Sequence, residues 1–194
     1  MKCTMLALVL TSLFAGGVQA QTTTAEATQR DSDQQQRIEQ GLQSGQLNTR
    51  EAASLEHRES QVDRTEARDM RDGSLSPAER ARITRQQNAV SRDIYQQKHD
   101  AQTGNPNSAS SRRMQADVQR DANQAQRIHN GVADGQVTNR EAASLERGQA
   151  RTTAREARAG ANGHVGALEQ QKIQRSENRQ SRHVYHARHD AQMR

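Results

Sequence analysis

Apolar residues recur at helical spacing along most of the chain, but they are sparse. Ile38 and Leu42 are four residues apart, and Leu55 and Val62 are seven apart. Such steps place side chains on one face of an α-helix. Because the apolar face is narrow, it resembles the seam of a coiled coil. We therefore predict an all-α fold with a thin, marginal core. The expected seam residues are Leu55, Val62, Ile83, Val90, Ile94, Leu145, Ile173 and Val184.

The chain contains a tandem duplication. The seven residues 50–56 return unchanged as residues 140–146, and an ungapped comparison of 36–102 with 126–192 finds identity at 28 of 67 positions. Repeats of this kind define the architecture. We predict two homologous three-helix units made of antiparallel helical hairpins. The expected divisions are a flexible lead-in at 21–30, unit 1 at 31–102, a polar linker at 103–111 and unit 2 at 112–194.

One turn pattern occurs four times, and its glycines are Gly45, Gly73, Gly135 and Gly163. A glycine commonly ends a helix, and a polar residue followed three positions later by Glu begins the next helix with a capping box. The predicted capping residues are Asn48, Glu51, Ser76, Glu79, Thr138 and Glu141. The same spacing of Gly and Glu occurs in EF-hand loops. However, Leu42 and Met70 stand where calcium needs oxygen ligands, so the pattern favours capping.

The N-terminal stretch Met1–Ala20 has the features of a cleavable signal peptide. Lys2 precedes an apolar run, and Val18-Gln19-Ala20 is a small-x-small cleavage pattern. The run is too short to span a bilayer. We therefore expect cleavage near Ala20 and a periplasmic or secreted protein without a membrane span. The single cysteine, Cys3, lies within this stretch, so no disulfide is expected.

Charge and aromatic content narrow the range of partners. The net charge is +5, which is compatible with binding to an anionic surface. The chain has two tyrosines and no tryptophan, so aromatic platforms for stacking bases are scarce. Nucleic acid is therefore not an expected partner.

The C-terminal histidines are the best sequence candidate for a metal site. His183, His186 and His189 follow one another at steps of three, and Asp190 is adjacent. Residues so spaced share one side of a helix, where imidazoles could bind Cu or Zn. The alternative is a solvated helix end, because only His189 has a histidine counterpart in unit 1, at residue 99.

Catalysis is not predicted. The dipeptides His99-Asp100 and His189-Asp190 offer two members of a hydrolytic triad, but no serine or cysteine is placed to complete it. The sequence predicts a protein that is not an enzyme.

The turns resemble a family signature. Leu75-Ser76-Pro77-Ala78-Glu79 and Val137-Thr138-Asn139-Arg140-Glu141 are similar to the Leu-Thr-x-x-Gln signature of the Spy and CpxP group, with Glu in place of Gln. This resemblance implies a small, basic, all-helical periplasmic stress protein or chaperone, in a group with zinc-linked relatives. The duplicated units as a whole also resemble secreted helical tandem-repeat proteins of proteobacteria, a likeness that implies no activity.

These observations give three functional hypotheses. The first is an exported, stress-associated, chaperone-like protein that binds an unfolded or envelope protein through apolar seams that a monomer leaves partly open. The second is a periplasmic Cu- or Zn-binding protein that uses the C-terminal histidines. The third is a structural envelope protein that self-associates.

Overall fold

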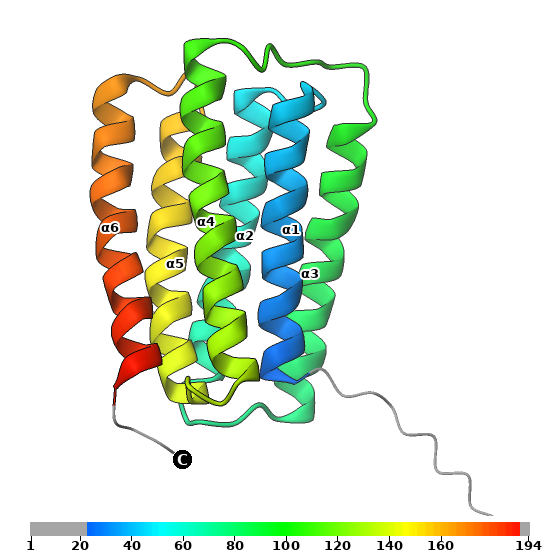
Figure 1. The fold of residues 1–194 in the computed structure, drawn as a ribbon. Coiled ribbons are helices and arrows are strands. Elements are labelled where there is room, and N and C mark those ends of the chain that lie inside the picture. The colour runs from blue at the N-terminus through cyan, green and yellow to red at the C-terminus, as the bar shows by residue number, and fades with distance from the viewer. Residues whose placement is uncertain (1–22, 191–194) are drawn as a thin grey trace, which may run out of the picture.

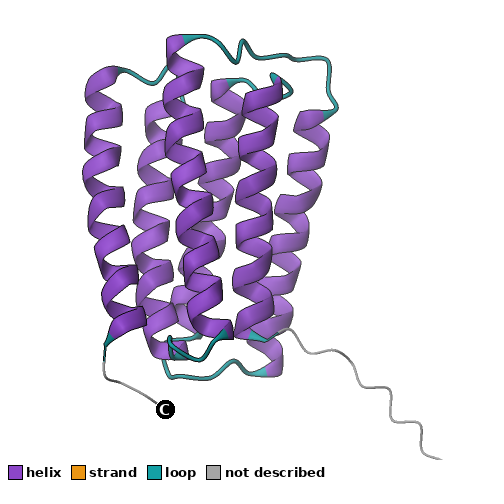
Figure 2. Ribbon diagram, in the orientation of Figure 1, coloured by secondary structure: helices purple, strands orange, loops and turns teal. Residues whose placement is uncertain are grey.

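The computed structural model describes residues 23–190, which form an up-and-down bundle of six α-helices (Figure 1). The helices are α1 (Thr24–Ser44), α2 (Thr49–Asp69), α3 (Pro77–Lys98), α4 (Ala109–Ala133), α5 (Asn139–Gly160) and α6 (Ala167–His189). No strand occurs in these residues (Figure 2), so the all-α prediction is confirmed. The predicted signal peptide, Met1–Ala20, lies outside the described residues. None of the described helices combines the length and apolarity that crossing a membrane requires.

The helices of the two sequence repeats interlock. The most extensive interface joins α2 to α5, and the next joins α1 to α4, so these four helices form the inner bundle. The outer helices lie at opposite edges of the bundle, where α3 packs on α1 and α2, and α6 packs on α4 and α5 (Figure 1). The main interfaces therefore connect one repeat with the other, and all six helices surround one interior.

Small residues allow α2 and α5 to approach closely. Ala53 of α2 and its repeat counterpart Ala143 of α5 are almost completely buried. A Cβ atom added to Gly160 would lie 2.8 Å from the Cβ of Ala53, closer than such atoms normally come. The glycine therefore sets the spacing between the two helices that contribute most of the buried charge described below.

The predicted helix caps form. Asn48, Ser76 and Thr138 precede α2, α3 and α5, and each side chain accepts a hydrogen bond from the backbone N–H three residues later. The glutamates at those later positions are Glu51, Glu79 and Glu141. The side-chain carboxylate of each accepts a hydrogen bond from the backbone N–H of its capping residue. The four turn glycines have φ angles of 75° to 98°, a conformation that glycine adopts without strain.

Two helices begin earlier than the sequence analysis predicted. Thr23 and Glu26 form a capping box, so α1 begins at Thr24 and residues 24–30 are helical where a flexible lead-in was expected. Ser108 accepts a hydrogen bond from the backbone N–H of Ser111 at 3.0 Å, so α4 begins within the predicted linker. Both starts use the capping chemistry of the other helices, but neither follows a turn glycine.

Apolar side chains gather in two clusters, one toward each end of the bundle. One cluster includes Leu47 and Ile94, and the other includes Met70 and Ile128. All eight predicted seam residues are buried, with exposed fractions of at most 4%. The expectation that a monomer leaves these seams partly open is therefore wrong. The exposed large apolar residues of the described part are Tyr95, Leu168 and Tyr185.

A first prediction concerns the apolar cluster around Leu55. The variant Leu55→Ala should lower the free energy of unfolding by about 2–5 kcal/mol, because it removes buried methyl groups and leaves a cavity. Denaturant unfolding followed by circular dichroism measures this loss. The control is Leu168→Ala, at a side chain that is 75% exposed, which should change stability by less than about 0.5 kcal/mol. An equal loss of unfolding free energy in both variants would contradict the burial of Leu55 in the apolar cluster.

Candidate metal centre

Between the two apolar clusters, the interior of the bundle is acidic. Eight buried carboxyl side chains, each at most 5% exposed, make up its central part, and Asp117 and Glu177 are buried beside them. The eight are Asp31, Glu56, Glu59, Asp63, Glu66, Asp121, Glu146 and Glu156. In the described part of the chain, every charged side chain that is buried is Asp or Glu, so no buried Lys, Arg or His balances these groups. Burial of an ionised carboxylate without a counter-ion is costly, so the arrangement requires a specific explanation.

The spacing of these residues explains why they meet. Glu56, Glu59, Asp63 and Glu66 follow one another in α2 at steps of three, four and three residues, which keeps them on one helix face. The corresponding face of α5 carries Glu146 and Glu156 at its two ends, with Gln149 and Thr153 between them. Because α2 and α5 pack closely together, these two faces share the centre of the bundle.

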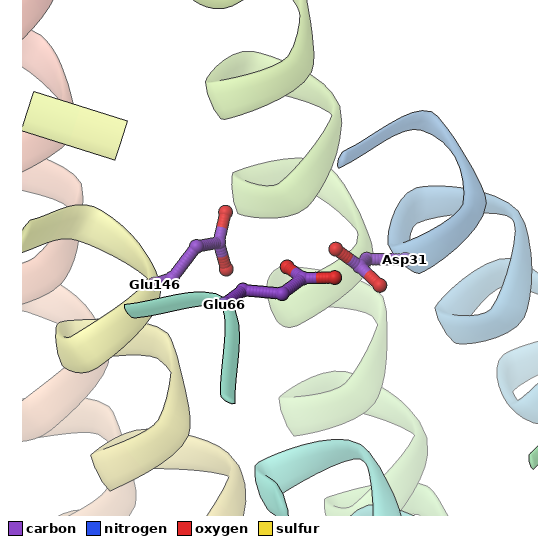
Figure 3. A group of neighbouring side chains, drawn as sticks. All are labelled: Asp31, Glu66 and Glu146. Atoms are coloured by element: carbon purple, nitrogen blue, oxygen red, sulfur yellow. The ribbon is translucent and has the colours of Figure 1, made fainter. Parts of the chain in front are cut away.

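The first cluster, which we call triad A, consists of Asp31 from α1, Glu66 from α2 and Glu146 from α5 (Figure 3). One oxygen of each carboxyl group lies within 4.8 Å of the others. Gln87 of α3 orients two of them, since its Nε2 donates to Asp31 Oδ1 at 2.7 Å and to Glu66 Oε1 at 3.0 Å. Asp31 Oδ2 and Glu66 Oε2 accept no hydrogen bond from an amide, hydroxyl or cationic group of the described residues, and the Asp31 and Glu66 carboxyl groups lie within hydrogen-bonding distance of each other.

The second cluster, triad B, consists of Glu56 from α2, Asp121 from α4 and Glu156 from α5, again with ligand atoms within 4.8 Å. The Nε2 of Gln35 donates to Glu56 Oε2 at 3.0 Å, and Thr153 Oγ1 donates to Asp121 Oδ2 at 3.2 Å. Within residues 23–190, no amide, hydroxyl or cationic group donates to Glu56 Oε1, Asp121 Oδ1 or either oxygen of Glu156. The Asp121 and Glu156 carboxyl groups lie within hydrogen-bonding distance of each other.

The sequence repeat relates the two triads. Asp31, Glu66 and Glu56 have the counterparts Asp121, Glu156 and Glu146, each 90 positions later. Each triad therefore takes an Asp and a Glu from one repeat and its third carboxylate from the other repeat.

The remaining two acids lie between the triads. Asp63 is close enough to Glu146, Asp31 and Asp121 for each to raise its pKa. Asp31 and Glu56 likewise raise the pKa of Glu59. Neither carboxylate oxygen of Glu59 has a hydrogen-bond partner in the described part. The eight carboxyl groups therefore form one continuous acidic region along the bundle axis.

Burial and mutual repulsion hold protons on these groups when no cation is bound. Burial raises the pKa of Asp31 to about 6 and that of Glu56 to about 7. The other six have pKa values well above the usual range, with burial as the main cause and neighbouring carboxylates as a further cause for most. In the metal-free protein, these groups therefore hold their protons more tightly than exposed carboxyl groups do.

The surroundings of the two triads differ. Glu177 of α6 occupies the repeat position of Gln87, and Arg120 Nη1 donates to Glu177 Oε2 at 3.0 Å. Burial raises the pKa of Glu177 to about 7, and burial together with Glu177 raises the pKa of Asp117 to about 8. Triad B therefore has two further acidic neighbours where triad A has a neutral amide.

The histidines predicted from the sequence do not converge. Within residues 23–190, the groups of three side chains that could hold a metal are the two triads, and neither contains His183, His186 or His189. The three histidines and Asp190 are exposed. His189 Nδ1 donates to the carbonyl oxygen of Tyr185 at 2.7 Å, and the two rings stack.

Sequence reasoning missed the acidic region, although the sequence contains a signal for it. Acidic residues are usually exposed, so the acids beside the apolar seam of α2 were not considered as core residues. The signal is the step of three, four and three residues from Glu56 to Glu66, together with identical acids at three repeat positions. A solvated helix face does not require acids at matching positions in both copies.

The donor set determines which ions the triads could hold. Carboxylate oxygens bind hard cations such as Ca²⁺, Mn²⁺ and Mg²⁺, whereas Cu and Zn sites usually include imidazole or thiolate. With metal–oxygen distances of about 2.1–2.6 Å, two ligands of one ion lie at most about 5 Å apart, which agrees with the spacing in both triads.

The fold and this site define a six-helix bundle with a carboxylate-lined interior. The chain matches no protein-family model, no curated protein and no solved structure.

Proposed function

We propose that this protein binds hard divalent metal ions, one at each carboxylate triad. The observation that supports this function is the same arrangement occurring twice: three buried carboxyl groups from three helices, with oxygens within 4.8 Å of one another and some of them accepting no hydrogen bond from a donor group of the described residues. Metal sites in helical bundles are typically built from side chains that project inward from facing helices.

A bound cation offsets the cost of burying these carboxylates. Two divalent ions, one at each triad, together neutralise four negative charges. Each ion also binds carboxylate oxygens that accept no hydrogen bond from a donor group of the described residues. The competing explanation is that the carboxyl groups share protons, since neighbouring carboxyl groups raise each other's pKa. The two explanations differ in their pH dependence and in their response to added metal.

Calorimetric titration of chelator-treated protein tests the proposal. At about pH 7.5, MnCl₂ and CaCl₂ should each bind with a stoichiometry of two ions per chain, and binding should release protons because the ligands must be deprotonated. The His183→Ala, His186→Ala, His189→Ala triple variant should retain both sites. An absence of saturable binding for both ions would refute the proposed function.

The Cu- or Zn-binding hypothesis remains a prediction and has a separate test. Titration with Cu(II) or Zn(II) should give an affinity that disappears in the same triple histidine variant. If affinity for these ions persists in that variant, the C-terminal histidines are not the ligands.

The chaperone-like and self-associating roles also remain predictions. Their physical motivation was the partial exposure of the apolar seams, and burial of those residues removes that motivation. Suppression of aggregation of a denatured client protein tests the first role, and sedimentation velocity tests the second.

A further inference from the structure

A basic pocket lies in the groove between α5 and α6, in the second repeat. It has a volume of about 220 Å³, and no acidic residue lines it. Its cationic lining residues are Arg147, Arg151, Arg155, Arg179 and His183. Ser176 and Thr152 add hydroxyl groups to the wall, and their side-chain oxygens lie 3.0 Å apart.

The arginines of this pocket lack acidic partners. In the described part of the chain, ion pairs involve Arg58, Arg68, Arg82 and Arg120, and none involves the four pocket arginines. Burial lowers the pKa of Arg155, and Arg179, Arg158 and Arg151 lower it further. The four side chains therefore concentrate positive charge at one place without internal compensation.

The first repeat provides an internal comparison, because the matching positions between α2 and α3 carry an ion pair in place of the arginine cluster. Arg58 stands at the position of Gly148 and forms an ion pair with Asp93, the counterpart of His183, at 2.8 Å. The counterparts of the four pocket arginines are His57, Gln61, Thr65 and Ala89. The second copy of this groove therefore carries a cluster of cationic side chains that the first copy lacks.

We infer that the α5–α6 groove is a binding site for a phosphate group, carried by a small molecule or by a lipid headgroup. Guanidinium groups bind phosphate through paired, charge-assisted hydrogen bonds. Arg155 Nη1 donates to Ser176 Oγ at 2.5 Å, a contact that holds one of these groups at the pocket wall. The site is separate from the carboxylate triads, and its ligand has the opposite charge.

Titration of metal-free protein with inorganic phosphate tests the small-molecule source. Phosphate should bind at one site per chain, and the Arg151→Gln, Arg155→Gln double variant should weaken this binding by at least tenfold. The control is the Arg92→Gln variant, on α3 at the opposite edge of the bundle, where the side chain is exposed. It removes positive charge without touching the pocket and should change affinity by less than twofold.

Vesicle co-sedimentation tests the lipid source. Phosphatidylglycerol vesicles should retain the wild-type protein and the Arg92→Gln variant, release the double variant, and lose the protein when soluble phosphate is added. Phosphatidylcholine vesicles serve as the zwitterionic control. The inference is overturned if neither phosphate nor phosphatidylglycerol binds, or if the double variant binds as well as the Arg92→Gln variant. Because these measurements need no metal, they are independent of the proposed metal function.

Discussion

Metal-free protein should melt at a temperature about 10 °C lower at pH 8 than at pH 5. Burial raises the pKa of Asp31 to about 6 and that of Glu56 to about 7 in the folded chain, whereas unfolded carboxyl groups titrate near pH 4. Between these values the folded state holds more protons than the unfolded state. The free energy of unfolding therefore falls as the pH rises through this range.

The size of this effect follows from the shifts. Between pH 5 and pH 8, the loss is about 1.4 kcal/mol for Asp31 and about 2.7 kcal/mol for Glu56, which together lower the melting temperature by about 10 °C. Scanning calorimetry in the presence of a chelator measures the melting temperature across the pH range. A profile that is flat or rises from pH 5 to pH 8 would contradict the acidic interior.

Adding Mn²⁺ or Ca²⁺ should reverse this trend. A ligand that binds only the folded state at 100 times its Kd stabilises that state by about 2.7 kcal/mol for each site. Because the ions compete with protons for the same oxygens, the stabilisation should grow with pH. If the carboxyl groups only share protons, the metal will have no effect at either pH.

The second large effect concerns the charge of the triads. Glu66→Gln and Glu156→Gln each preserve side-chain volume but remove one carboxylate, from triad A and triad B respectively. At pH 8 each variant should be more stable than wild type when metal-free, because the unfolded wild-type chain has an ionised carboxylate at this position whose burial is costly, and the amide avoids that cost. Each should also bind one ion per chain where wild type binds two, and the double variant should bind neither.

A metal ligand and a purely structural residue can be distinguished here, because replacing the ligand raises metal-free stability while it removes one bound ion. Calorimetric stoichiometry and metal-free melting temperatures at pH 8 provide the two measurements. The matched control is Asp33→Asn, two residues from Asp31 on α1 but exposed, which should leave both quantities unchanged. Two bound ions in the Glu66→Gln, Glu156→Gln double variant would exclude the triads as ligands.

Local features of the fold were predictable from the sequence, because they depend on neighbouring residues. The cap at Ser76 with Glu79 and the left-handed glycine at Gly45 each involve only a few consecutive positions. Burial of Leu55 and Ile83 followed from helical spacing. The start of α1 was missed because Thr23 and Glu26 form a capping box without a preceding turn glycine.

The metal centre was not predictable in the same way, because its parts come from distant segments. Asp31 and Glu146 meet only because α1 and α5 belong to one bundle, and the sequence repeat alone suggested that each unit packs on itself. The periodicity of apolar residues also cannot predict that Glu59 and Asp63 are buried, because their burial depends on the α2–α5 interface. Topology therefore supplied the information that residue spacing lacked.

Each triad takes one glutamate from the other repeat, which relates the two triads by an approximate symmetry. Glu146 completes triad A, and Glu56 completes triad B, so each repeat supplies two carboxylates to one triad and one to the other. Two identical copies of one repeat, packed symmetrically, would have two identical triads. Because the two copies are joined in one chain, they can differ, as they do at Glu177 and at the pocket arginines.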